Sequence, residues 1–116
     1  MSGNISEKTG IEEIRFGSGG GFTGAVKAYS LSADGQLTEQ DDQNGLSKKI
    51  NTKTTLELFT LAKELKTYSL NEPDNVYSFI EIKSRETTNK IVWAFGSTKA
   101  DQKVTDLFNQ LSSLTK

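Results

Sequence analysis

Residues 75–95 read NVYSFIEIKSRETTNKIVWAF, and this stretch decides the fold. Two runs within it, 75–83 and 90–95, are rich in aromatic and β-branched residues, which is typical of β-strands. The polar residues 84–89 between these runs predict a loop. The stretch therefore predicts two antiparallel strands joined as a hairpin.

The chain before this hairpin predicts three more strands. Residues 12–16 form a short run that alternates loosely, and residues 24–31 form a longer one. Asp34 and Gly35 follow as a turn sequence, so residues 36–40 are expected to return as the second strand of another hairpin.

Two further stretches have the period of an amphipathic helix. The first covers residues 54–68, and its apolar residues share one face: Leu58, Leu61, Ala62 and Leu65. Thr54 and Glu57 match a capping box at its start. The second covers residues 100–114, and its apolar face carries Val104, Leu107, Phe108 and Leu111. Ser97 or Thr98 is the expected cap of this helix, with Asp101 in its first turn.

The order of elements is therefore β-β-β-α-β-β-α, which predicts an α+β fold. We expect an antiparallel sheet of about five strands with two helices packed on one face. Residues 1–10 are polar and predict a disordered tail, and residues 11–116 predict a single domain. Strand alternation places Tyr77 and Phe79 on the face away from the helices. This face is either an exposed aromatic patch or is covered by the N-terminal hairpin.

Composition excludes several classes of function. The 116 residues include no cysteine and no histidine, which removes thiolate metal sites, thiol nucleophiles and histidine-based catalytic units. The net charge of −1 argues against nucleic-acid binding, which needs a basic surface. We expect no cofactor and no metal site. The acidic residues 39–45 do not follow the order of an EF-hand, so they predict a solvated hairpin end.

The most unusual segment is GSGGGFTG at residues 17–24. It satisfies the letters of a nucleotide-binding glycine motif, but a strand and not a helix is expected after it. Three other interpretations are open: a backbone nest for an anion, a structural turn or bulge, and an exposed loop that inserts into a partner with Phe22 at its tip. The candidate contact residues are Gly19, Gly20, Gly21, Phe22, Thr23 and Gly24 in this segment, and Tyr77 and Trp93 on the sheet.

We therefore expect a non-enzymatic, monomeric binding module whose ligand is an unknown protein or small molecule. An enzyme would have to rely on carboxylates, as glycoside hydrolases do, and Glu81 is the most notable carboxylate because it interrupts an apolar strand. Strand alternation explains Glu81 equally well as a side chain on a partly solvated face.

The segment at residues 14–24, together with Tyr29, residues 34–35, residues 73–77 and residues 91–96, resembles a group of small bacterial domains of unknown function. These domains are common in the Bacteroidetes and are often attached to lipoprotein signals. The resemblance implies an extracytoplasmic location and a lipid anchor upstream of Met1, with a cytoplasmic location as the alternative.

A second resemblance concerns Gly20, Gly21, Phe22 and Gly24 alone. These residues are similar to a segment near the start of small bacterial inhibitors of thermolysin-like metalloproteases. This resemblance implies that the glycine loop would enter the active-site cleft of a protease.

Overall fold

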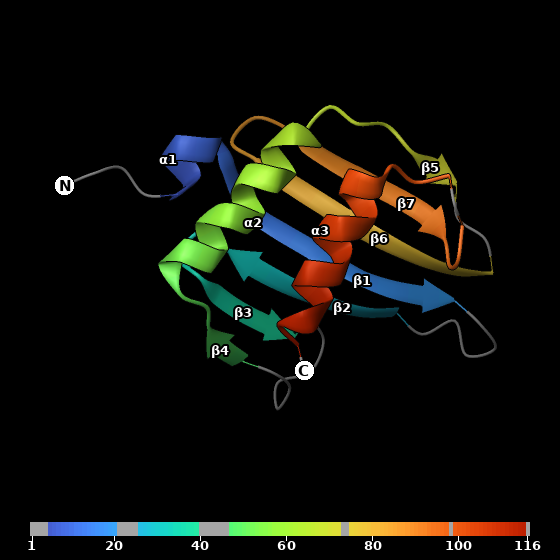
Figure 1. Cartoon of the computed structure of the whole chain (residues 1–116), viewed down its shortest axis with the longest axis horizontal. Helices are drawn as coiled ribbons and strands as arrows, with labels where there is room; N and C mark the ends of the chain where they lie inside the picture. The colour runs from blue at the N-terminus through green and yellow to red at the C-terminus, as the bar shows by residue number, and fades with distance from the viewer. Residues whose placement is uncertain (1–4, 21–25, 40–46, 73–74, 98, 116) are drawn as a thin grey trace.

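The computed structural model describes residues 5–20, 26–39, 47–72, 75–97 and 99–115. It contains the strands β1 (Ile11–Gly20), β2 (Val26–Ser32), β3 (Gln36–Glu39), β4 (Ser47–Lys49), β5 (Asn71–Glu72), β6 (Val76–Ser84) and β7 (Thr88–Ala94). The helices are α1 (Ile5–Thr9), α2 (Thr52–Glu64) and α3 (Gln102–Ser113). The strands form one sheet in the order β4-β3-β2-β1-β6-β7-β5, and α2 and α3 lie across the same face of it (Figure 1). The expected α+β class is confirmed.

The sheet differs from the predicted one in detail. All five expected strands are present, but β4 and β5 are added at the two edges, and β5 runs parallel to β7. These edge strands have only three and two residues, so they carry no alternation that a sequence pattern could reveal. The first strand is also longer than expected, because β1 includes residues 17–20 of the glycine segment.

Helix α2 begins and ends earlier than predicted. Its N-cap is Asn51, whose side chain accepts a 2.7 Å hydrogen bond from the backbone N–H of Thr54, so the predicted capping box at Thr54 is wrong. Asn51 is suited to this role because a short side-chain oxygen can reach the free N–H groups of the first turn. The C-cap is Leu65, and residues beyond it form turns.

Helix α3 is capped by Asp101, not by Ser97, and Thr98 lies outside the described residues. The Asp101 carboxylate accepts a 2.9 Å hydrogen bond from the backbone N–H of Lys103. The backbone N–H of Asp101 donates to the Tyr68 hydroxyl at 3.1 Å, which ties the start of α3 to the segment after α2.

The expected disordered tail over residues 1–10 is corrected for residues 5–9. These residues form α1, and Ile5 is buried in the main core. Thr9 is also buried, and its hydroxyl donates to the Ile5 carbonyl at 2.8 Å. A single apolar residue in a polar stretch gives no helical period, so this helix depends on its contacts with the rest of the domain.

The main core lies between α2, α3 and one face of the sheet. Its fully buried side chains include Phe16, Leu31, Phe59, Ile80 and Leu107. The opposite face has no helix over it among the described elements, and β1 and β2 extend the sheet instead of folding across it (Figure 1). Strands β1 and β2 of the N-terminal hairpin therefore do not cover the aromatic residues of that face; the turn between them, residues 21–25, lies outside the described residues. No helix in the described part of the chain is long and apolar enough to cross a membrane.

Candidate functional site: the glycine end of the sheet

The glycine segment begins inside the sheet. Gly19 of β1 pairs with Val26 at the start of β2 and with Tyr77 of β6, and Gly20 pairs with Val76 at the start of β6. Phe95 follows β7, and its backbone N–H donates to the Val76 carbonyl at 2.9 Å. We call this region the glycine end, defined by Gly19, Gly20, Val26, Val76, Tyr77 and Phe95.

The glycines within β1 allow its neighbours to approach closely. A Cβ atom on Gly17 would lie 2.0 Å from the carbonyl oxygen of Lys27, and one on Gly20 would lie 1.8 Å from that of Asn75. Gly20 also has a φ of +95°, which strongly favours glycine. Packing of the sheet thus explains the glycines at these two positions.

Residues 17–19 are paired on both sides, with β2 and with β6. A strand held in this way directs its backbone groups to its neighbours, so this half of the segment does not form a nest for a phosphate or another anion. Gly21, Phe22, Thr23 and Gly24, the other candidate contact residues of the segment, lie outside the described residues.

Tyr77 occupies the space beside Gly19 that a side chain would fill. A Cβ atom on Gly19 would lie 2.8 Å from the Tyr77 hydroxyl oxygen. Tyr77 packs against a small apolar cluster of Ala28, Phe79 and Val92, which is separate from the main core. The sequence placed Tyr77 and Phe79 on the face away from the helices, and the pairing agrees: Gly17 faces Phe79 across the strands, as Gly19 faces Tyr77.

Three large apolar side chains remain exposed among the described residues, and all three lie at the glycine end. Val26 is 48% exposed, Val76 is 42% exposed and Phe95 is 73% exposed. They come from three different strand ends: Val26 and Val76 are paired with Gly19 and Gly20 at the end of β1, and Phe95 lies beside Val76. Strand alternation places Val26 on the face of Ala28 and Val76 on the opposite face, with Ile80. Exposed apolar side chains that lie close together are typical of surfaces that contact another protein.

None of these three residues was among the contact residues predicted from the sequence. Strand alternation predicts that Phe95 shares a face with Ile91 and Trp93, which are buried, but Phe95 lies just beyond the end of β7 and is 73% exposed. The available sequence signal was position: Val76 and Phe95 lie at or next to the ends of predicted strands, and Val26 lies two residues after the glycine segment.

Trp93, which the sequence suggested as a contact residue, does not lie on this surface. It is 5% exposed and belongs to the main core, where its ring meets that of Phe108 edge-on at 5.3 Å between centroids. The structure therefore corrects this assignment and makes Trp93 a packing residue.

Three charged residues on the face of the sheet away from α2 and α3, Glu13, Arg15 and Glu81, have partners within the sheet. Arg15 donates to Glu81 at 3.1 Å across β1 and β6, and Ser30 donates to Glu13. Glu81 is therefore engaged in an ion pair. In the described part of the chain, no group of three acidic side chains is arranged to hold a metal ion, and the acidic residues 41 and 42 lie outside that part.

No protein-family model matches the chain, and no curated protein matches it either.

Proposed function

We propose that this protein is a non-enzymatic binding module that contacts a partner protein through the glycine end of its sheet. The observation that supports this proposal is that the exposed large apolar residues of the described chain, Val26, Val76 and Phe95, all lie at this one end of the sheet. Large apolar side chains on a surface cost free energy in water, and burial against a partner recovers it. An exposed aromatic residue such as Phe95 is the type of side chain that anchors protein interfaces.

The strands beneath this surface favour a rigid contact. β1 lies between β2 and β6 and is paired with both along most of its length. The apolar cluster of Ala28, Phe79 and Val92 supports Tyr77 from below. A surface that is already ordered loses little conformational entropy when it binds, which increases the affinity that its apolar area can provide.

Site-specific photo-cross-linking tests this proposal. A photoreactive phenylalanine analogue replaces Phe95 in one preparation and Lys63, an exposed residue of α2, in a control preparation. Each is irradiated in an extract of the cells that produce the protein. We expect a discrete cross-linked product at position 95 that excess unlabelled wild-type protein removes.

A second competitor in the cross-linking reaction tests whether these three side chains form the contact surface. It is the unlabelled triple variant Val26→Ser, Val76→Ser, Phe95→Ser. It should keep the fold, because exposed substitutions usually change stability by less than about 0.5 kcal/mol each. It should also fail to remove the cross-linked product. Equal products at positions 95 and 63, or equal competition by the triple variant and the wild type, would contradict the proposal.

A further inference from the structure

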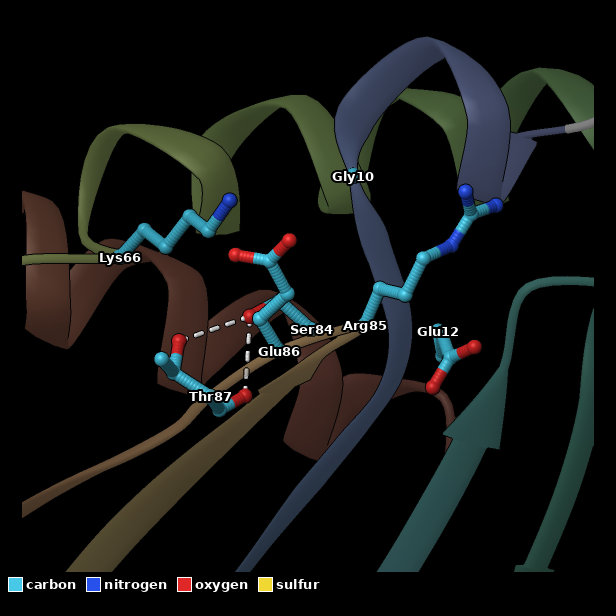
Figure 2. Close-up of a pocket in the computed structure, with 7 residues that line it drawn as sticks. All are labelled: Gly10, Glu12, Lys66, Ser84, Arg85, Glu86 and Thr87. Atoms are coloured by element: carbon cyan, nitrogen blue, oxygen red, sulfur yellow. Dashed lines mark hydrogen bonds between the residues drawn. The ribbon is translucent and has the colours of Figure 1, made fainter.

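A second surface feature lies at the opposite end of β1 and β6. It is a pocket of about 550 Å³ lined by Gly10, Glu12, Lys66, Ser84, Arg85, Glu86 and Thr87 (Figure 2). We call it the charged pocket. Its lining comes from three separate parts of the chain: Gly10 with the start of β1, the segment after α2, and the end of β6 with the turn that follows it. Its volume falls within the range of small-molecule sites.

A β-bulge directs Glu12 to this pocket. Ile11 pairs with Ser84 and Glu13 pairs with Lys83, so Glu12 is an extra residue with no partner in β6. Bulges of this kind change the direction of a side chain and are frequent beside binding sites. The Glu12 carbonyl accepts a 3.1 Å hydrogen bond from Ala33, which fixes the bulge against the end of β2.

Lys66 lies against Gly10 on the other side of the pocket. A Cβ atom on Gly10 would be 3.4 Å from the Lys66 ammonium nitrogen, and the φ of Gly10 is +78°. The turn before it is held by buried Thr9, whose hydroxyl accepts from the Ile11 N–H at 3.2 Å. Asn89 holds the segment that carries Lys66, because its amide donates to the carbonyls of Leu65 and Tyr68.

The turn between β6 and β7 supplies the remaining charges. The Ser84 hydroxyl and the Ser84 backbone N–H both donate to the Thr87 carbonyl, each at 2.8 Å, and this closes the turn. Arg85 and Glu86 form the tip between these two residues. Figure 2 shows the ends of Lys66 and Glu86 on one side of the pocket and those of Arg85 and Glu12 on the other.

The charges in the pocket balance. Two cations, Lys66 and Arg85, face two carboxylates, Glu12 and Glu86, and neither of the two ion pairs found among the described residues involves any of them. A ligand with charge of one sign would meet repulsion from two of these groups. A ligand with one ammonium and one carboxylate could satisfy both kinds and form charge-assisted hydrogen bonds with each.

We propose that the charged pocket binds a small zwitterion of the amino-acid or dipeptide class. Lys66 would bind its carboxylate on one side of the pocket, and Glu12, which the bulge directs there, would bind its ammonium group on the other side. This proposal is independent of the function proposed for the glycine end, because the two sites lie at opposite ends of the same strands.

Titration of the full chain with glycylglycine, followed by amide chemical shifts, tests this proposal. We expect saturable shifts at Gly10, Glu12, Lys66 and residues 84–87, while Val26, Val76 and Phe95 stay unchanged. N-acetylglycinamide has the same backbone without charges and should cause no saturable shift. Acetate alone and methylammonium alone should each bind at least about tenfold more weakly, the factor expected for the loss of one charge-assisted hydrogen bond.

The variants Lys66→Gln and Glu12→Gln should each weaken the binding of glycylglycine about tenfold. Lys63→Gln removes an equivalent charge from the exposed side of α2 and should leave the affinity unchanged. The absence of saturable shifts with glycylglycine would overturn the proposal, and so would equal shifts with N-acetylglycinamide. Acetate that binds as tightly as glycylglycine would also overturn it, in favour of a site for anions.

Discussion

Gly17 of β1 lies directly against the backbone of Lys27 in β2, so close that a Cβ atom on Gly17 would be 2.0 Å from the Lys27 carbonyl oxygen. The same atom would be 2.8 Å from the Cα atom of Ala28. Both neighbours are backbone atoms of a paired strand, so neither can move without opening the sheet. We expect Gly17→Ala to reduce the free energy of unfolding by about 3 kcal/mol, at the upper end of the cost of overpacking.

Urea denaturation measures this loss, and Ser18→Ala is the matched control. Ser18 is the next residue of the same strand and is exposed, so its replacement should change the free energy of unfolding by less than about 0.5 kcal/mol. A Gly17→Ala protein as stable as the Ser18→Ala protein would show that β1 and β2 are not packed as described.

Gly19→Ala provides a second, milder test of the same strand. The atoms that a Cβ on Gly19 would meet are the Tyr77 hydroxyl oxygen at 2.8 Å and a methyl carbon of Val26 at 2.9 Å. Both belong to side chains that can rotate, so we expect a loss of about 1 kcal/mol, near the lower limit for overpacking. The Tyr77 ring signals in an NMR spectrum should shift at the same time. A loss as large as that of Gly17→Ala would contradict this distinction.

The contact between Trp93 and Phe108 should be measurable as a coupling energy. Edge-on aromatic pairs contribute about 0.5–1.5 kcal/mol beyond the area that they bury. A double-mutant cycle of Trp93→Leu and Phe108→Leu should give a coupling in this range. Trp93→Leu combined with Leu37→Ala is the control, because β2, β1 and β6 lie between β3 and β7 and distant substitutions are additive. Additive losses at Trp93 and Phe108 would argue against the described packing of α3.

The fold class was predictable because its main elements have long and regular hydrophobic patterns. The face of α3 that carries Val104, Leu107 and Leu111 is buried as the 3.6-residue period requires. Alternation in β6 likewise separates Ile80 from Phe79, which lie on opposite faces of the sheet. In both cases burial follows the local period, so the sequence alone contains the information.

The remaining features depend on contacts between distant segments. The burial of Ile5, the bulge at Glu12 and the short strand β5 each arise from a neighbour far away in the chain. The residues of the candidate site likewise divide into those that a local sequence pattern indicates and those that depend on contacts between distant segments. Gly19, Gly20 and Tyr77 were found from composition and alternation, but Val26, Val76 and Phe95 became visible only when four strand ends came together.

Asn89 joins β7 to the chain that follows α2, and its replacement should loosen that connection. Its side-chain amide donates to the Leu65 carbonyl at 3.0 Å and to the Tyr68 carbonyl at 2.8 Å. Asn89→Ala leaves both acceptors without this donor and should cost about 1–3 kcal/mol. Asn89→Asp should cost more at neutral pH, because a carboxylate cannot donate and would repel both carbonyls.

Thermal denaturation can rank these variants, with Thr88→Ala as the control at the neighbouring, exposed position of β7. We expect the order of stability to be wild type and Thr88→Ala first, then Asn89→Ala, then Asn89→Asp. An Asn89→Asp protein as stable as the wild type at neutral pH would show that the amide does not hold these carbonyls.

Asp34 provides a prediction of pH dependence. The Ser32 hydroxyl donates to its carboxylate, the Gln36 backbone N–H donates at 3.1 Å, and Lys49 adds a favourable charge, so the pKa of Asp34 is held below its ordinary value of 3.8. A carboxyl group with a lowered pKa in the folded state stabilises the fold above pH 3.8, and this contribution is lost as the pH falls through the folded-state pKa. Ser32→Ala removes the largest cause, so it should raise the pKa of Asp34 towards 3.8. Carboxyl carbon NMR measures this change directly, with Ser113→Ala on α3 as a control that removes a hydroxyl elsewhere. If Ser32→Ala left the pKa of Asp34 where it is in the wild type, the hydroxyl would not be the group that stabilises the carboxylate.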